Sequence, residues 1–238
     1  MIAIVSSTIF PSAAPIYWGG HRRIIPSHER LGATQKTIQS LLRANVDEVY
    51  LADNSGENWV PRTEDDLKPA KVYVFGHFQF LNKGISELYL LLSVLPHLPA
   101  NTPILKISGR YYLKNGLTFE LGGVDVAAHF TVYARTQLWM STRCYLVKDK
   151  TVYERFLKDT LRELYAYQAR IVGPGSLLRI LRNSLSPQRD DSPYDDPRQP
   201  IELAAARVLN RTDYRVKKVD MLGIEGITGD EARSLLIE

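Results

Sequence analysis

The chain has 238 residues, of which 45% are apolar and 24% are charged, and its formal net charge is +4 at pH 7. This composition is typical of a folded globular protein and excludes disorder as the state of most of the chain. The longest apolar runs, such as residues 88–98, are far shorter than the roughly 20 residues that a membrane-spanning helix needs. The sequence starts MIAIVSSTIF, which lacks a basic leader and a small-residue cleavage site, so we expect a mature first strand and a cytosolic protein.

The cysteine and histidine contents limit the chemistry further. Cys144 is the single cysteine, which allows neither an internal disulfide nor a cysteine metal cluster and agrees with a reducing compartment. The five histidines are scattered without the ligand spacing of a zinc site. The modest positive charge suits a nucleic acid, an anionic membrane surface or a phosphorylated substrate, and it does not separate these three.

Short apolar runs alternate with helix-like patterns through the first half of the chain. Strands are predicted at residues 2–7, 47–53 and 71–76 and in the stretch 103–116, and helices at 30–44 and 85–95. Such alternation is typical of a parallel sheet built from βα units, so we expect a Rossmann-like unit here. In the first helix, Thr34, Ile38, Leu41 and Leu42 share one face, which we expect to pack on the sheet.

The second half is less regular. Strands are predicted at residues 129–135 and 142–147, helices at 151–171, 177–185 and 201–209, and a closing strand and turn within 214–229. Prolines mixed with acids predict a mobile loop at residues 186–200. We expect both halves, residues 1–115 and 116–238, to belong to one domain.

Polar residues follow each predicted strand of the first half, in SSTIFPS, ADNSGEN, GHFQFLNKG and SGRYYLKNG. In an open α/β sheet, ligands collect at the carboxyl ends of the strands. Each segment alone is also ordinary loop chemistry, but the four together favour a convergent polar site.

The stretch PILKISGRYYLKNG, residues 103–116, is an apolar strand that becomes cationic at its end. Because side chains alternate along a strand, we expect Lys106, Ser108, Arg110, Tyr112 and Lys114 to project to one side. A buried idle charge is costly, so this pattern favours an anion-binding role. A solvated edge, or pairing with an acid such as Glu120, is the alternative.

The first half resembles the nucleotide-sugar half of GT-A glycosyltransferases. The segments that carry the resemblance are SST after the first strand, HERLGATQKTIQSLL, VDEVYLADNSGEN and NKGISELYLLL. The sequence looks most like small bacterial enzymes of surface-polysaccharide or lipopolysaccharide assembly. The resemblance covers about residues 1–115 and implies an α/β fold: a Rossmann-like, GT-A-type mixed sheet flanked by helices, with a helical C-terminal part.

The resemblance places nucleotide contacts after the second strand. Asp53 falls where such enzymes keep an acid that hydrogen-bonds the base or ribose, and Asn54 and Ser55 would assist it. The same residues followed by Gly56 also make a good turn, which is the structural alternative.

Further nucleotide contacts are implied on the first strand and the first helix. Ser6, Ser7 and Thr8 fall where the first loop lines the base pocket. Arg30 falls where a basic residue at a helix entry approaches the nucleotide.

A third set of positions lies at a later helix start. Asn82, Lys83 and Gly84 match the segment near the sugar diphosphate, where backbone amides and the helix dipole favour anions. The three residues also suit an ordinary helix entrance.

The sequence departs from the GT-A pattern at the fourth strand. Members commonly place Asp-x-Asp there to hold a divalent cation, whereas this chain contains no Asp-x-Asp and reads ISGRYY at that place. A fixed guanidinium can neutralise a departing phosphate directly, so Arg110 and Lys106 are candidates for the role of the missing metal. No cofactor is required by this interpretation, but magnesium or manganese held by Asp65 and Asp66 or by the 186–200 loop is left open.

The catalytic base has several candidates. An inverting transferase needs a carboxylate near the acceptor hydroxyl, and Glu202 resembles the acid at a helix start in the acceptor half of many inverting members. Asp195, Asp196, Asp125 and Glu87 compete with it. An acid that merely stabilises the first turn of a helix is the alternative for Glu202.

The sequence therefore predicts a glycosyltransferase that moves a sugar from a nucleotide-sugar donor to a glycan or lipid-linked acceptor. The positive charge would suit a peripheral position at the inner membrane face as well as the donor diphosphate. A sugar nucleotidyltransferase and a non-enzymatic nucleic-acid-binding module are the two alternatives, although we expect no nucleic-acid partner. The chain has no Gly-x-Gly-x-x-Gly, P-loop or Gly-x-Ser-x-Gly motif. These absences weigh against a standard dinucleotide-binding enzyme, a P-loop NTPase and an α/β-hydrolase.

Overall fold

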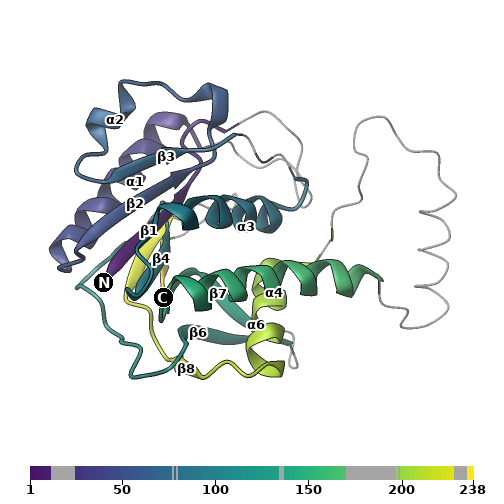
Figure 1. The fold of residues 1–238 in the computed structure, drawn as a ribbon. Coiled ribbons are helices and arrows are strands. Elements are labelled where there is room, and N and C mark those ends of the chain that lie inside the picture. The colour runs from purple at the N-terminus through teal and green to yellow at the C-terminus, as the bar shows by residue number, and fades with distance from the viewer. Residues whose placement is uncertain are drawn as a thin grey trace, which may run out of the picture.

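Seven strands form one mixed sheet in the order β3-β2-β1-β4-β7-β6-β8, with helices on both faces (Figure 1). The computed structural model describes residues 1–11, 25–76, 78, 80–133, 137–169, 197, 199–227 and 235–238. The large sheet is made of β1 (Ile2–Ser7), β2 (Glu48–Asp53), β3 (Lys71–Val74), β4 (Ile104–Ser108), β6 (Val126–Tyr133), β7 (Gln137–Val147) and β8 (Val216–Val219). A second sheet, of order β10-β9-β5, contains β5 (Tyr111–Leu113), β9 (Ile224–Ile227) and β10 (Leu235–Ile237).

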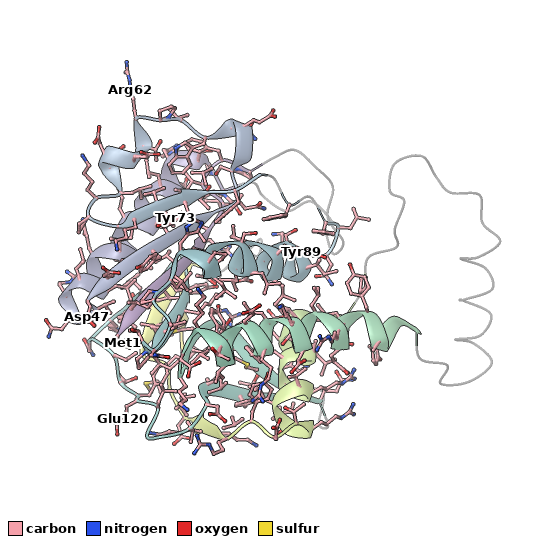
Figure 2. The ribbon with its side chains drawn as sticks, viewed as in Figure 1. Met1, Asp47, Arg62, Tyr73, Tyr89 and Glu120 are labelled. Atoms are coloured by element: carbon pink, nitrogen blue, oxygen red, sulfur yellow. The ribbon has the colours of Figure 1, made fainter. Side chains whose placement is uncertain are left out.

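The first four strands of the large sheet run parallel, as the alternating pattern predicts. β1 pairs with β2 on one side and with β4 on the other, and β2 pairs with β3. The loop after each of these strands therefore leaves from the same edge of the sheet. At the opposite edge, where the strands begin, the amino group of Met1 forms an ion pair with Asp47 (Figure 2).

Helix α1 (Ser27–Arg43) covers one face of the sheet. Its Ile38 and Leu41 pack into a buried cluster with odd-numbered residues of β1 and β4 and with residues of β5 and β9. The expectation for Leu42 is wrong, because its side chain is 38% exposed. The buried face of α1 includes Thr37 and Ser40, which contact β5. The Thr37 hydroxyl donates to the Tyr111 carbonyl (2.7 Å), and the Leu113 amide donates to the Ser40 hydroxyl (3.0 Å).

The other face is covered by α3 (Lys83–Val94), α4 (Lys150–Ala169) and α6 (Ile201–Arg211). Figure 1 shows α3 and α4 running side by side, with α6 next to α4. α3 and α6 approach closely, since a Cβ added at Gly84 would lie only 2.7 Å from Ile201 Cβ. The short helix α2 (Thr63–Asp66) and two turns of 3₁₀ helix, η1 (Gly56–Asn58) and η2 (Leu95–His97), complete the described helices.

The stretch 103–116 is two strands in two sheets. β4 ends at Ser108, the chain turns at Gly109, and β5 pairs with β9 in the small sheet. The turn is fixed because the Gly109 amide donates to the Ser6 carbonyl (2.8 Å), and a Cβ at Gly109 would lie 3.0 Å from Thr34 Oγ1. The expectation that all five polar residues from Lys106 to Lys114 share one face is therefore wrong.

The residues after this turn belong to a separate charged group. The Tyr112 hydroxyl donates to Glu225 (2.5 Å), and Lys114 forms an ion pair with the same carboxylate (3.1 Å). Lys36 lies 3.6 Å from the centre of the Tyr112 ring. These contacts connect α1 to the small sheet. They also separate Tyr112 and Lys114 from the anion-binding site expected at the end of β4.

Strand β7 contains an irregularity that matters for the site. β6 pairs with β7 through Ala128 and Tyr145 and again through Phe130 and Met140, so residues 141–144 lie opposite His129 alone. The bulge brings the Thr142 carbonyl under β4, where it accepts a hydrogen bond from Lys106.

The second half agrees in part with the sequence predictions. Both hairpin strands and the helices at α4 and α6 are present, whereas β5 and β10 were not predicted as separate strands. The predicted helix 177–185 and most of the 186–200 loop lie outside the described residues. Across the ranges that the structure describes, no helix is long and apolar enough to cross a membrane.

Candidate functional site

Asp53 connects the loops that follow β1 and β2. Its side chain is fully buried; one carboxylate oxygen accepts from the Ile9 amide (3.0 Å) and the other from the Ser55 amide (2.9 Å) and the Ser55 hydroxyl. Burial raises the pKa of Asp53, although the hydrogen bonds from Ser55, Ile9 and Ser7 oppose the rise. Asp53 is predicted to bind the nucleotide, but both of its carboxylate oxygens accept hydrogen bonds from the chain itself. These bonds hold the first loop in place.

Asn54 holds the loop after β3 in a similar way. Its amide oxygen accepts from the Phe78 amide (2.8 Å), and its amide nitrogen donates to the Phe78 carbonyl (3.3 Å). Ser55 is also buried and accepts from the Phe10 amide through its hydroxyl (2.9 Å). The structure thus brings the ends of β1, β2 and β3 together, as the polar segments predict.

Arg30 enters the same edge from the first turn of α1. Its guanidinium donates to the carbonyl of Thr8 (3.0 Å) and to that of Ile25 (3.0 Å). Burial lowers the pKa of Arg30, the positive charge of Arg110 lowers it further, and Asp53 opposes both. Thr8 takes part through its backbone, so Arg30 and Thr8 are brought together with Asp53.

Arg110 lies in the turn between β4 and β5. The described residues place no carboxylate within ion-pair distance of its guanidinium, Glu120 included. Its charge is close enough to act on Arg30. Arg30 and Arg110 thus bring two positive charges to this edge, and in the described part of the chain Arg110 has no carboxylate within ion-pair distance.

Lys106 is fully buried on the face of β4 that α3 covers, opposite to the face that α1 covers. Its ammonium group contacts three acceptors: Glu87 Oε1 (2.5 Å), Ser108 Oγ (2.9 Å) and the Thr142 carbonyl. The ammonium group donates two hydrogen bonds and forms one ion pair, and its side chain has no exposed surface, so we do not expect it to contact a ligand. Glu87 comes from α3 and also accepts from the Ser6 hydroxyl (3.0 Å), which places Ser6 in this group.

Glu202 lies at the start of α6, next to the Lys106 group. Its Oε1 lies 3.4 Å from the Thr142 hydroxyl, a long hydrogen bond. Burial raises the pKa of Glu202, and the negative charge of Glu87 raises it further, while Arg143 and Lys106 lower it. A carboxyl with a raised pKa beside a second, ion-paired carboxylate is the arrangement in which two acids take different roles.

Asn82 caps α3 and connects it to α6. Its side-chain oxygen accepts from the Gly84 amide (2.9 Å), and its amide nitrogen donates to the carbonyls of Pro197 and Gln199. The Asn82 side chain is buried by these contacts, whereas Lys83 is exposed. Asn82 therefore positions the segment that leads into Glu202.

Other acids named by the sequence are engaged elsewhere or lie outside the description. Asp125 accepts from the Arg215 amide (3.0 Å) and guanidinium (3.2 Å), and Asp65 pairs with Lys68 on the exposed helix α2 (2.7 Å). Asp195 and Asp196 fall outside the described residues. Over the described ranges, no group of three or more His, Cys, Asp or Glu side chains could hold a metal ion.

Glu87 is the functional candidate that sequence reasoning named only as a competing acid. A signal for it exists: a lysine inside the apolar run ILKIS needs a partner, and Glu87 is the one acid between residues 80 and 100. Thr142 was missed because its carbonyl reaches Lys106 only through the bulge in β7.

Comparisons with known proteins bear on the fold. No protein-family model matches this sequence, and no curated protein matches it. Among solved structures, a nucleoside-diphosphate-sugar pyrophosphorylase from Vibrio cholerae matches with a TM-score of 0.52 at 10% identity, over 98% of this chain and 97% of that chain. HddC from Yersinia pseudotuberculosis, complexed with GMP-PN, matches with a TM-score of 0.51 at 11% identity, over 98% and 96%.

The galactosyltransferase LgtC, solved with donor and acceptor sugar analogs, matches with a TM-score of 0.46 at 10% identity, over 76% of this chain and 70% of that chain. The first two likenesses establish the architecture. The chain therefore has a GT-A-like, nucleotidyltransferase-like α/β fold with a seven-stranded mixed sheet, similar to the folds of these two structures.

Proposed function

We propose that the protein is a glycosyltransferase that moves a sugar from a nucleotide donor to a glycan or lipid-linked acceptor. The observation that carries the proposal is Arg110 in the turn after β4, whose guanidinium has no carboxylate within ion-pair distance among the described residues and whose charge acts on Arg30. This is the place where GT-A enzymes commonly hold a metal on the diphosphate. A guanidinium there can neutralise the departing nucleoside diphosphate through two parallel hydrogen bonds.

The transfer step uses groups from both halves of the chain. The acceptor hydroxyl attacks the anomeric carbon of the donor sugar, and the bond from that carbon to the diphosphate oxygen breaks. The electron pair leaves with the nucleoside diphosphate, which Arg110 of the 1–115 half stabilises. The hydroxyl proton passes to Glu202 of the 116–238 half, whose raised pKa brings its basicity closer to neutral pH.

The other predicted residues have supporting roles in this proposal. Asp53, Asn54 and Ser55 hold the loops that would surround the nucleotide, and Arg30 supports the first loop through its hydrogen bond to the Thr8 carbonyl. Lys106 is fully buried and ion-paired with Glu87, so its proposed role changes from neutralising the diphosphate to holding Glu87. The net charge of +4 would also favour an acceptor at an anionic membrane surface.

A sugar nucleotidyltransferase is the second candidate, and the likeness to the Vibrio cholerae pyrophosphorylase favours it. The two activities release different products: a glycosyltransferase releases a nucleoside diphosphate from a nucleotide sugar, whereas a nucleotidyltransferase releases pyrophosphate from a nucleoside triphosphate and a sugar 1-phosphate. We expect release of nucleoside diphosphate from a panel of nucleotide sugars, with Arg110→Gln reducing it. Pyrophosphate release with no diphosphate release would replace the first proposal by the second.

A further inference from the structure

Among the described residues, all contacts that hold the Glu87 side chain go to one of its two carboxylate oxygens. Oε1 receives both contacts, the ammonium group of Lys106 at 2.5 Å and the hydroxyl of Ser6 at 3.0 Å. Throughout the described part of the chain, Oε2 has no hydrogen-bond or ion-pair partner. The side chain is 24% exposed, so the carboxylate reaches solvent while its position is fixed from behind.

The charged groups around Glu87 are Lys106 and Glu202, and the charge of Arg143 also acts on Glu202. Lys106 is fully buried and donates hydrogen bonds to Ser108 and Thr142, and Glu202 is a second carboxyl in the same group. Burying a lysine is costly unless its charge is paired, and a well-packed apolar pair would often be at least as stable. A buried ion pair whose second carboxylate oxygen has no partner among the described residues, on a side chain that is partly exposed, therefore suits a binding role better than a purely structural one.

We propose that Glu87 binds a hydroxyl of the sugar through Oε2 and restricts the site to uncharged sugars, with Lys106 and Ser6 as positioning residues. A sugar hydroxyl donates to a carboxylate oxygen, whereas the carboxylate of an acidic sugar can only accept and carries the same charge. The proposal rests on the proposed function, since it assigns the sugar class of that same site.

The test compares nucleotide sugars that differ only in this charge. Binding of UDP-glucose is measured against UDP-glucuronate, and binding of GDP-mannose against GDP-mannuronate, with UDP and GDP alone as references. One of the two nucleotides, UDP or GDP, is expected to bind. For that nucleotide, we expect the uncharged sugar to bind at least about tenfold more tightly than the uronate. Glu87→Gln should bring the two affinities to within about threefold, because the repulsion disappears. Glu48→Gln, at the far end of β2, is the matched control and should keep the wild-type ratio.

A variant that lacks Glu87 leaves Lys106 buried without a partner and can fail to fold. The double variant Lys106→Met/Glu87→Gln removes both charges and should also accept the uronate. Equal affinity for both members of a pair in the wild-type protein, or an unchanged ratio in the folded variants, overturns the assignment of Glu87. Loss of binding for UDP, GDP and all four sugars instead removes the proposed function, and this assignment falls with it.

Discussion

Lys106 on β4 and Glu87 on α3 form an ion pair at the centre of the candidate site, with 2.5 Å between Nζ and Oε1. The pair fixes α3 against the sheet at the level where β1 and β4 end, since Ser6 donates to the same oxygen. The position of α3, and with it the Asn82 contact to the start of α6, depends on a charge that is fully buried.

Removal of Lys106 should therefore destabilise the fold strongly. Lys106→Met leaves the Ser108 hydroxyl and the Thr142 carbonyl without their donor and Glu87 without its cation. Breaking a buried ion pair from one side costs about 3 kcal/mol or more in the free energy of unfolding, measured by urea denaturation. Lys106→Met combined with Glu87→Leu should recover part of that loss. If the single variant is as stable as the wild type, the buried pair does not hold α3.

Glu202 should make the stability of the protein depend on pH. Burial raises its pKa in the folded state, so the folded protein binds this proton more tightly than the unfolded chain does. The contribution of Glu202 to the unfolding free energy is then largest below the ordinary glutamate pKa. It decreases as the pH rises from that value through the raised folded one.

The difference between wild type and Glu202→Gln isolates this effect. Urea unfolding of both proteins between about pH 4 and pH 8 should show the wild type losing stability relative to the variant as the pH increases. A difference that stays constant, or changes in the opposite direction, would mean that the Glu202 carboxyl is not buried in this way.

The turn at Gly109 can be tested with two glycines of different surroundings. In Gly109→Ala the new Cβ would lie 3.0 Å from Thr34 Oγ1 and 3.2 Å from Ser7, so we expect a loss of about 1–3 kcal/mol. Gly32 lies inside α1 with no heavy atom within 4 Å of an added Cβ, and Gly32→Ala should gain about 1 kcal/mol from helix propensity. Thermal unfolding of the two variants should move in opposite directions.

Much of the first half could be predicted from the sequence because its information is local. An apolar run followed by a polar loop and an amphipathic helix predicts a parallel βα unit, and β1 has the bounds that the run IAIVSS indicates. The convergence of Asp53, Asn54 and Ser6 at one edge follows from the parallel order of the strands.

The remaining features depend on contacts between distant residues. The break between β4 and β5 results from the close approach of Gly109 to Thr34 and Ser7, which no strand pattern contains. The group around Lys106 depends on the bulge in β7 and on the packing of α3, so alternation along one strand could not show that Lys106 is paired with Glu87.

The central claim is that Arg110 receives the donor diphosphate. The most direct measurement is calorimetric titration of UDP, GDP, UDP-sugars and GDP-sugars into the wild type and Arg110→Gln. Each titration is made once in EDTA and once in magnesium. The matched control is Arg62→Gln, because the Arg62 side chain points away from the protein in Figure 2. Arg110→Gln should weaken nucleotide-diphosphate binding about 10- to 100-fold in EDTA, as expected for a charge-assisted hydrogen bond. Arg62→Gln should bind as the wild type does. Equal affinity of wild type and Arg110→Gln, or binding only of oligonucleotides with a steep loss of affinity in salt, would contradict the claim.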